Sequence, residues 1–309
     1  MSVTEPRGEE LIARYRANYG IPEDAHVTED MILHHWELEK QLRHSLLEST
    51  PENRWEVFEE AYTRLYQELG WLNELADVGE DHTADFSVWH QIIGEPPQHI
   101  YEVGSGKGEL VSYLAEQGFA CKATEITRER GEKWASSTAN LTWGNSDGIH
   151  LAQFEPEESY DVLISRHVVE HMHPDDVQAH CIHAFKILKP GGRYVLTTPH
   201  KASGPSDITR VFGHADPLGM HLKEYTYREL ATPLRGAGFT VSAAFRFPKS
   251  LRARLPFKSF TSRVYLGYLI WLEGALASIG DHRRRLRTAK AARAALFPEN
   301  IMVAAHKPH

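Results

Sequence analysis

The sequence lacks several features that would place it outside the ordinary globular proteins. Only two of its 309 residues are cysteines, and the spacing of Cys121 and Cys181 fits neither a zinc site nor a redox motif. No run of 18 uncharged apolar residues occurs, so no segment is expected to span a membrane. The first ten residues are polar and acidic, unlike a signal peptide. These absences predict a cytoplasmic protein.

Acidic charge dominates the chain but is distributed unevenly. The formal net charge is −8, whereas residues 248–298 contain eleven Lys and Arg against two acids, a local net charge of +9. The rest of the chain therefore carries −17. A basic segment on an acidic body indicates either a solvated helix face or a contact surface.

The most informative segment is a glycine-rich turn between a short apolar strand and a helix. Gly104, Gly106 and Gly108 alternate with Ser105 and Lys107 in this turn, and an acid, Glu102, precedes them. Glycines allow a tight turn and a close approach to a ligand, and the helix that follows points its free N–H groups at the same place. The G-x-G-x-G spacing differs from the G-x-G-x-x-G fingerprint of dinucleotide-binding proteins.

Polar residues also follow the next two predicted strands. Glu125 ends the strand at 120–124, about twenty residues after Gly104, where an acid can accept hydrogen bonds from both hydroxyls of a ribose. The strand at 141–144 ends on Asn145, Ser146 and Asp147. Together with the glycine-rich turn, these residues predict a nucleoside-binding edge.

Later motifs complete a resemblance to one family. They are YDVLISR at 160–166, HVVEH at 167–171, an LKPGG turn at 188–192 with an apolar strand to 199, HLKEYTYREL at 221–230 and GAGF at 236–239. In this order they resemble the Rossmann-like (class I) S-adenosylmethionine (AdoMet) methyltransferases, in particular the family that includes ubiquinone-biosynthesis O-methyltransferases. The resemblance covers about residues 98–246 and the last ten residues.

The resemblance implies AdoMet as the cofactor and identifies residues that would hold it. The implied cofactor-binding residues are Glu102, Gly104, Ser105, Gly106, Gly108, Glu125, Ile126, Asn145, Ser146, Asp147 and Arg166. Many relatives carry aspartate at the position of Asn145, where it accepts from the adenine amino group. Asparagine can accept through its carbonyl oxygen, so Asn145 and Asp147 both stay candidates for this contact.

The order of elements predicts an α/β fold. Strands and helices alternate over 98–199, which favours a parallel sheet covered by helices on both faces. With two more strands, at 239–247 and 300–306, the resemblance implies a seven-stranded Rossmann-like methyltransferase sheet. The predicted domains are a helical cap or lid at 1–85, the AdoMet-binding core at 86–247, a basic helical insertion at 248–298 and the last strand of the core at 299–309.

Three histidines are candidates for a general base. Methyl transfer from a sulfonium requires an aligned acceptor and, where the acceptor is a hydroxyl, removal of its proton. His167 and His200 follow the fourth and fifth strands, and the resemblance places His221 in a loop over the acceptor site. His167 and His171 are four residues apart, a spacing that on a helix can bind a metal, but we expect no metal here.

These observations predict an AdoMet-dependent methyltransferase that acts on the hydroxyl of a small-molecule, glycan-type or lipid-linked acceptor. The alternatives are an N- or C-methyltransferase of the same fold and a non-catalytic AdoMet-binding or scaffolding protein. The G-x-G-x-G spacing and the LKPGG turn argue against a nicotinamide oxidoreductase. We expect no nucleic-acid partner.

The basic insertion allows two interpretations. Tyr265, Tyr268 and Trp271 recur at helical spacing, and the cluster Arg283 to Arg287 follows them. The helix can pack on the domain or on a second subunit of a homodimer, or it can lie on the inner face of a membrane or cover a lipid-linked acceptor. Glu273 and the shortness of the apolar run exclude a spanning helix under both interpretations.

Overall fold

The computed structural model describes residues 4–76, 83–127, 138–247, 254, 258–293 and 297–309. The chain divides into two compact units. The smaller unit comprises Met1–Asp81 with Ser203–Glu224, and the larger comprises His82–Ala202 with Tyr225–His309.

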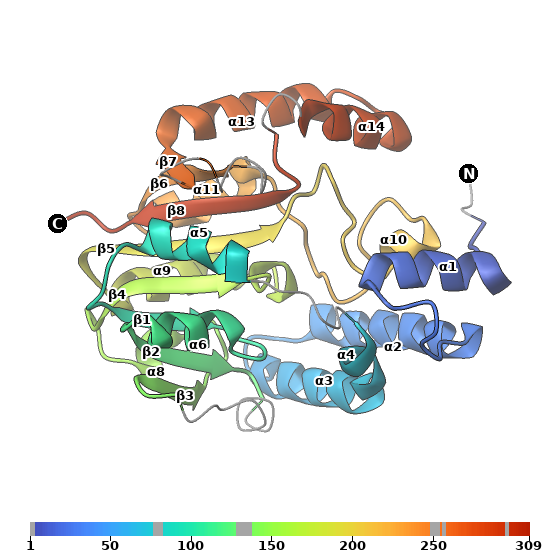
Figure 1. Ribbon diagram of the computed structural model, residues 1–309, viewed down its shortest axis with the longest axis horizontal. Coiled ribbons are helices and arrows are strands. Elements are labelled where there is room, and N and C mark those ends of the chain that lie inside the picture. The colour runs from blue at the N-terminus through green and yellow to red at the C-terminus, as the bar shows by residue number, and fades with distance from the viewer. Residues whose placement is uncertain (1–3, 77–82, 128–137, 248–253, 255–257, 294–296) are drawn as a thin grey trace. The chain divides into compact units, whose positions relative to one another are not determined.

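The larger unit is built on one eight-stranded sheet (Figure 1). Its strands are β1 (His99–Val103), β2 (Ala120–Glu125), β3 (Leu141–Asn145), β4 (Tyr160–Arg166), β5 (Leu188–Pro199), β6 (Thr240–Arg246), β7 (Ser259–Ser262) and β8 (Asn300–His306). The order across the sheet is β3-β2-β1-β4-β5-β8-β6-β7. The first five strands in this order run parallel, and β8 is antiparallel to both β5 and β6. The predicted α/β Rossmann-like fold is confirmed.

The eighth strand, β7, corrects the prediction of seven strands. It lies inside the segment that the sequence indicated as a purely helical insertion, and it pairs antiparallel with β6 at the edge of the sheet. Phe245 of β6 lies opposite Phe260 of β7, with ring centroids 5.2 Å apart. Such a cross-strand aromatic pair stabilises an edge pairing, but a four-residue strand is too short to show a clear alternation in sequence.

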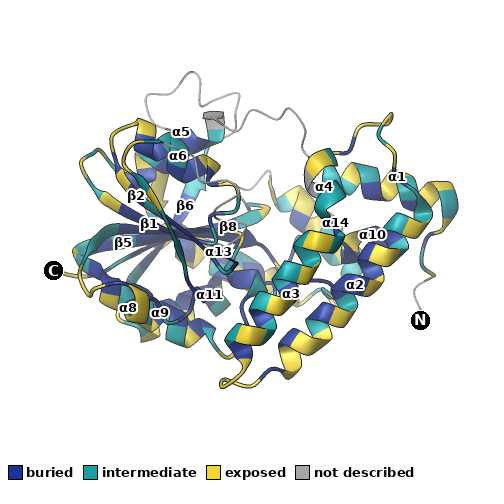
Figure 2. Cartoon of the chain, turned by 90° about the horizontal axis from the view of Figure 1, so that it is seen from below, coloured by how far each residue is buried: buried dark blue, intermediate teal, exposed yellow. Residues whose placement is uncertain are grey.

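Helices cover both faces of the sheet, as predicted. On one face, α5 (Thr83–Ile93) and α6 (Glu109–Glu116) share an apolar cluster with β1, β2 and β4. On the other face lie α9 (Val177–Ile187), α11 (Tyr227–Gly236) and α13 (Arg263–Ala277), and the short α8 (Leu151–Phe154) precedes β4. Figure 2 shows the strands buried between helices whose outer faces are exposed. Among the described residues, no helix combines the length and hydropathy that crossing a membrane requires.

A buried carboxylate joins the insertion to the core of this unit. The Nε2–H of His200 donates to Glu273 Oε1 of α13 (2.8 Å), and the backbone N–H groups of Tyr227 and Arg228 donate to the same carboxylate. Those two N–H groups are in the first turn of α11, where a negative charge also meets the positive end of the helix dipole. A capping box formed by Thr226 and Glu229 completes this helix start. Glu273, the acid within the apolar run, is therefore an anchor that joins α13 to His200 and to the start of α11.

The smaller unit is helical, as the N-terminal sequence predicted. It contains α1 (Gly8–Tyr19), α2 (Glu29–Glu48), α3 (Arg54–Glu68), α4 (Gly70–Leu75) and α10 (Thr209–Phe212). Thr28 caps α2 by accepting the Met31 N–H at 3.3 Å. The ring of Phe212 stacks on Trp36, with centroids 4.6 Å apart, which explains why segment 203–224 belongs with these helices although the sequence placed it in the core range 86–247. The role of these helices as a lid stays a prediction.

Candidate active site

The carboxyl ends of four parallel strands form the edge of the sheet where the predicted cofactor residues lie. Glu125 is paired with Asn145 in the ladder, and Val103 is paired with Thr124 on one side and Ser165 on the other. In open α/β sheets, ligands bind beyond such ends. The residues at or just after these four ends are Glu102, Gly104, Ser105, Gly106, Gly108, Glu125, Ile126, Asn145, Ser146, Asp147 and Arg166.

The glycine-rich turn is constrained by its backbone conformation and by its neighbours. Gly104, Gly106 and Gly108 have φ values of 61°, 60° and 71°, a region that residues with a Cβ rarely adopt. A Cβ on Gly104 would lie 2.7 Å from Val168 Cγ2, and one on Gly108 would lie 2.6 Å from Trp143 Cζ2. The left-handed Gly108 is also the N-cap of α6, so the helix begins at Glu109.

Two polar side chains fasten this turn to the adjoining strands. The Ser105 hydroxyl donates to the Glu102 carbonyl at 3.1 Å, and the Ser105 N–H donates to the Thr124 carbonyl at 2.9 Å. The Gly106 N–H donates to the buried carboxylate of Glu125. The turn and the acid after β2 are thus held as one unit.

Asn145 and Asp147, the two candidates for the adenine contact, are in different surroundings. The Asn145 amide nitrogen donates to the carbonyls of Glu125 (3.1 Å) and Ile126 (2.8 Å), which places it beside the end of β2. The Asp147 carboxylate accepts the backbone N–H groups of Ile149 and His150, each at 2.8 Å, and lies 2.6 Å from His150 Nδ1. Asp147 therefore caps its own turn, whereas the Asn145 amide group is held at the end of β2. Ser146 lies between them, and its Oγ accepts the Gly148 N–H at 3.1 Å.

Glu102 is a fully buried acid, and only one of its two carboxylate oxygens has a hydrogen-bond partner among the described residues. Arg166 Nε donates to Glu102 Oε1 at 3.2 Å, but Oε2 has no hydrogen-bond partner among the described residues. Burial raises the pKa of Glu102 to about 7, although Arg166 opposes the rise. The Arg166 guanidinium in turn lies 5.5 Å from the centroid of the Phe86 ring.

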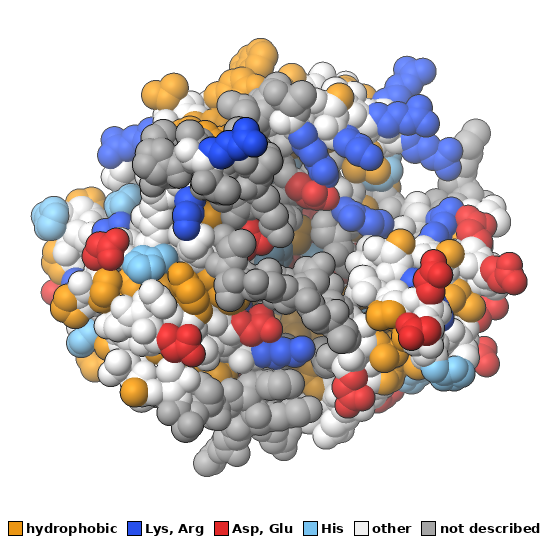
Figure 3. Space-filling view, in the orientation of Figure 1, with side chains coloured by type: hydrophobic (Ala, Val, Ile, Leu, Met, Phe, Trp, Pro, Cys, Tyr) orange, Lys and Arg blue, Asp and Glu red, His pale blue; other side chains and the backbone are white. Residues whose placement is uncertain are grey.

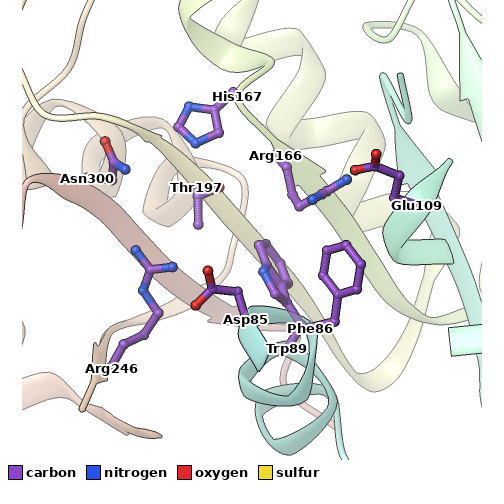
Figure 4. A pocket seen from close by; sticks show the side chains of 9 residues that line it. All are labelled: Asp85, Phe86, Trp89, Glu109, Arg166, His167, Thr197, Arg246 and Asn300. Atoms are coloured by element: carbon purple, nitrogen blue, oxygen red, sulfur yellow. The ribbon is translucent and has the colours of Figure 1, made fainter. Parts of the chain in front are cut away.

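A cavity of about 180 Å³ lies within the larger unit, at the ends of β4 and β5. Its lining is Asp85, Phe86, Trp89, Glu109, Arg166, His167, Thr197, Arg246 and Asn300 (Figure 4). Phe86 and Trp89 are one helical turn apart on α5 and form the apolar part of the wall. Arg166 thus connects the cavity to Glu102 and the glycine-rich turn.

His167 is the predicted base that lines this cavity. Its side chain is 49% exposed, and its Nδ1 lies 3.3 Å from Oε1 of the fully buried Glu170. The hydroxyl of Thr198 donates to the other oxygen of Glu170 at 2.9 Å. The backbone at His167 has φ 55°, an uncommon value for a residue with a side chain, and its N–H donates to the Thr197 carbonyl at 2.9 Å.

The other two candidate bases are in different environments. His200 is completely buried: its Nδ1 accepts the Ala202 N–H at 2.9 Å, so Nε2 carries the proton that is donated to Glu273. Both of its ring nitrogens are occupied. His221 belongs to the smaller unit, where its Nδ1 lies 2.9 Å from Glu224 Oε1.

The spacing of His167 and His171 would suit a metal only if segment 167–171 were helical. Segment 167–171 does not form a helix; Val169–His171 makes a single 3₁₀ turn, and His167 precedes it in a left-handed conformation. His167 and His171 therefore do not lie one turn apart on a helical face. The hydrogen bond of the His167 N–H to β5 diverts the chain at this point.

Seven residues of the cavity wall were not predicted: Asp85, Phe86, Trp89, Glu109, Thr197, Arg246 and Asn300. The spacing of Phe86 and Trp89, just before the first strand, was the available signal for an aromatic wall. Arg246 and Asn300 are 54 positions apart in the chain and become neighbours only because β8 inserts between β5 and β6.

Comparisons with known proteins agree with this architecture. A family model described as a methyltransferase domain matches residues 82–244, just over half of the chain. A ubiquinone biosynthesis O-methyltransferase of Paramagnetospirillum magneticum is 33% identical over 155 residues, which cover 46% of this chain and 59% of that protein. A probable S-adenosylmethionine-dependent methyltransferase of Mycolicibacterium smegmatis is 33% identical over 175 residues, 51% of this chain and 62% of that protein. The chain thus spans about three fifths of the length of these relatives.

Solved structures support the fold at lower identity. The 1,6-didemethyltoxoflavin-N1-methyltransferase of Burkholderia thailandensis, solved with 1,6-didemethyltoxoflavin and S-adenosylhomocysteine, has a TM-score of 0.50 and 16% identity. The alignment covers 84% of this chain and 92% of that chain. At this identity the similarity concerns the fold alone.

Proposed function

Because the chain belongs to the methyltransferase domain family, we propose that it transfers the methyl group of AdoMet to the hydroxyl of a small-molecule or glycan-type acceptor, with His167 as the general base. The resemblance to class I methyltransferases is confirmed by the family match and by the two curated relatives. The choice of hydroxyl and of His167 is supported by the site itself.

The residues at the glycine-rich turn fit the proposed cofactor. AdoMet supplies a methyl group that its sulfonium already activates for displacement. The amino acid part of AdoMet carries an ammonium and a carboxylate, and the buried pair of Glu102 and Arg166 offers one opposite charge to each. Glu102 Oε2 has no hydrogen-bond partner in the described part of the chain, and such a buried acceptor is costly until a donor satisfies it. Glu125 would hold the ribose and Asn145 the adenine amino group.

His167 has the environment that a base for a hydroxyl requires. The Glu170 carboxylate beside Nδ1 favours the tautomer with the proton on that nitrogen, which leaves Nε2 to accept the proton of the acceptor. Glu170 is itself held by Thr198, which fixes its carboxylate at ion-pair distance from Nδ1 of His167. The 49% exposure of His167 lets an acceptor reach it. His200 cannot be reached in this way and has no ring nitrogen left to accept a proton, because it is buried and both of its ring nitrogens make hydrogen bonds within the protein.

The cavity wall also favours a small acceptor. A space of about 180 Å³ holds a ring or a short chain, and the aromatic side chains of Phe86 and Trp89 suit a planar or apolar group. The polar side chains of Thr197 and Asn300 can orient a hydroxyl at the opposite part of the wall. That one relative is named as an O-methyltransferase gives further support to transfer to oxygen.

The test is a transfer assay with AdoMet carrying a labelled methyl group. Phenols, catechols, sugars and aromatic amines would be offered one at a time, with S-adenosylhomocysteine formation and methylated product as readouts. His167→Ala should lower turnover at least a hundredfold with AdoMet affinity retained, since a positioned base contributes about 10²–10⁴-fold. His34→Ala is the matched control, because His34 is also half-exposed and paired with a glutamate, at 2.8 Å from Glu68.

Other results would change the proposal in defined ways. If only amines gave a methylated product, the acceptor atom in the proposal would be nitrogen instead of the oxygen of a hydroxyl. AdoMet binding without transfer to any acceptor class would favour a binding or scaffolding protein. Full activity of His167→Ala would remove the assignment of the base.

A further inference from the structure

The outer face of α13 exposes an apolar stripe. Val264 is 84% exposed, Trp271 66% and Tyr268 36%, and their spacing of four and three residues places them on one side of the helix. Tyr265, Leu266 and Leu269 on the opposite side are buried against the sheet. The rings of Tyr268 and Trp271 stack, with centroids 6.3 Å apart. The helix thus packs on its domain, as one interpretation of the sequence held, and still presents a second apolar face.

This stripe is a local concentration of exposed apolar side chains. Eight large hydrophobic residues are exposed in the described part of the chain, and four of them lie within positions 260–271, since Phe260 of β7 is the fourth. Single exposed apolar residues need no explanation, but a contiguous group of them marks a contact surface. Glu273, the acid of α13, is buried and anchored inside, so it adds no negative charge to this face.

The next helix, α14 (His282–Ala292), provides a basic surface. Arg283, Arg284, Arg287 and Lys290 are exposed on it, and Arg285 is partly buried. In the described part of the chain, none of these five has an acid within ion-pair distance, whereas Arg293 pairs with Glu299 at 2.8 Å. Asp281 is used as the N-cap of the helix, where it accepts the Arg284 N–H at 2.7 Å. Figure 3 shows hydrophobic side chains along the upper edge, over α13, with Lys and Arg side chains beside them, over α14.

We propose that α13 and α14 together bind the surface of an anionic membrane. The apolar stripe (Val264, Tyr268 and Trp271) would enter the boundary between headgroups and acyl chains, where Trp and Tyr are enriched, and the basic face of α14 would lie on the anionic headgroups. α13 has 15 residues, about 22 Å, which suits a helix in the plane of the membrane and not across it. A symmetric dimer through this surface would place two arginine-rich helices against each other, which is unfavourable.

Vesicle sedimentation tests this surface independently of methyl transfer. The protein should co-sediment with vesicles of equimolar phosphatidylcholine and phosphatidylglycerol at low salt, bind vesicles of phosphatidylcholine alone far more weakly, and be released as salt rises. Replacement of Arg283, Arg284, Arg285 and Arg287 by glutamine should weaken binding on the order of hundredfold. The matched control replaces Arg7, Arg64, Lys186 and Arg235 by glutamine, which removes the same charge elsewhere and should leave binding within about twofold.

The apolar stripe has its own arm of the experiment. Val264→Ser with Trp271→Ser should weaken binding at least tenfold, while Phe154→Ser with Ile182→Ser, at two exposed apolar positions away from α13, should not. Brominated acyl chains should quench tryptophan fluorescence in wild-type protein, and Trp271→Phe should lose most of that quenching while still binding. Circular dichroism would confirm that each variant is folded.

Several results would overturn the membrane proposal. They are equal binding to neutral vesicles, no binding at low salt, and unchanged binding of the arginine variant. A dimer in solution that the Val264→Ser, Trp271→Ser variant abolishes, without vesicle binding by wild type, would assign the surface to a second copy of the chain instead.

Discussion

Two buried glutamates of the larger unit differ in how far their hydrogen bonds are completed. Glu273 of α13 accepts from His200 and from two backbone N–H groups of α11, so both of its oxygens are engaged. Glu102 of β1 is engaged by Arg166 through Oε1, while its Oε2 has no hydrogen-bond partner among the residues described. A completed set of bonds holds elements together, whereas an incomplete one in a buried place is costly unless a ligand completes it.

The histidines after β4 and β5 repeat this contrast. Both ring nitrogens of His200 make hydrogen bonds, and its side chain is fully buried. His167 has one ring nitrogen at ion-pair distance from Glu170, and its side chain is about half-exposed. In sequence the two are equivalent, since each directly follows a strand. Exposure and the number of bonds made, rather than the presence of an acidic neighbour, therefore distinguish a candidate base from a structural histidine.

The largest expected effect is on stability, at the completed site. Glu273→Ala would leave the His200 Nε2–H and two N–H groups of α11 buried without an acceptor, and we expect the free energy of unfolding to fall by about 3–5 kcal/mol in urea titrations. Glu299→Ala is the control, because its ion pair with Arg293 is about half-exposed and should cost less than about 1 kcal/mol. If the unfolding free energy fell equally in the two variants, Glu273 would contribute no more to stability than the surface acid Glu299, which would contradict its role as an anchor.

The next effect is on turnover, at the incomplete site. His167→Ala should lower turnover at least a hundredfold, about 2.7 kcal/mol in the activation free energy, with little change in the unfolding free energy. His200→Ala should do the reverse and destabilise the fold, because it leaves the Glu273 carboxylate without its buried partner. If both variants stayed folded and lost turnover to a similar extent, the assignment of a catalytic role to His167 and a structural role to His200 would be wrong.

A smaller effect is expected at Glu125, the proposed ribose contact. Glu125→Ala should weaken AdoMet at least tenfold, about 1.4 kcal/mol, since it removes the acceptor of two charge-assisted hydrogen bonds. Calorimetric titration with AdoMet measures this change. Glu116→Ala, on the same unit but at the far end of α6, should leave the dissociation constant unchanged.

The elements that could be predicted from the sequence are those fixed by local signals. The strand Asn300–His306, the Thr226 capping box and the glycine-rich turn each follow from residues that are neighbours in the chain. Glu102, Glu125 and Arg166 could be placed at one edge because parallel strands carry their ends to one side.

What could not be predicted depends on contacts between distant segments. Arg246 and Asn300 line the same cavity only because of the strand order. His200 is a structural residue because its Nε2 is hydrogen-bonded to Glu273, 73 positions later in the chain. The strand β7 depends on pairing with β6 rather than on its own four residues. The left-handed backbone at His167 is set by its bond to β5 and has no signature in the local sequence.

The proton balance of AdoMet binding tests most directly whether Glu102 binds the ammonium group of the cofactor. Because burial raises the pKa of Glu102 to about 7, the free protein holds this proton below that pH, and an ammonium placed at Oε2 would stabilise the ionised form and release it. Calorimetry in buffers of different ionisation enthalpy should detect about one proton released per AdoMet near pH 6, and the dissociation constant should fall about fivefold between about pH 6 and pH 7. Glu102→Gln should abolish both effects. AdoMet binding without proton release near pH 6, and with the same pH dependence in Glu102→Gln, would contradict the assignment of this incomplete carboxylate as the cofactor's partner.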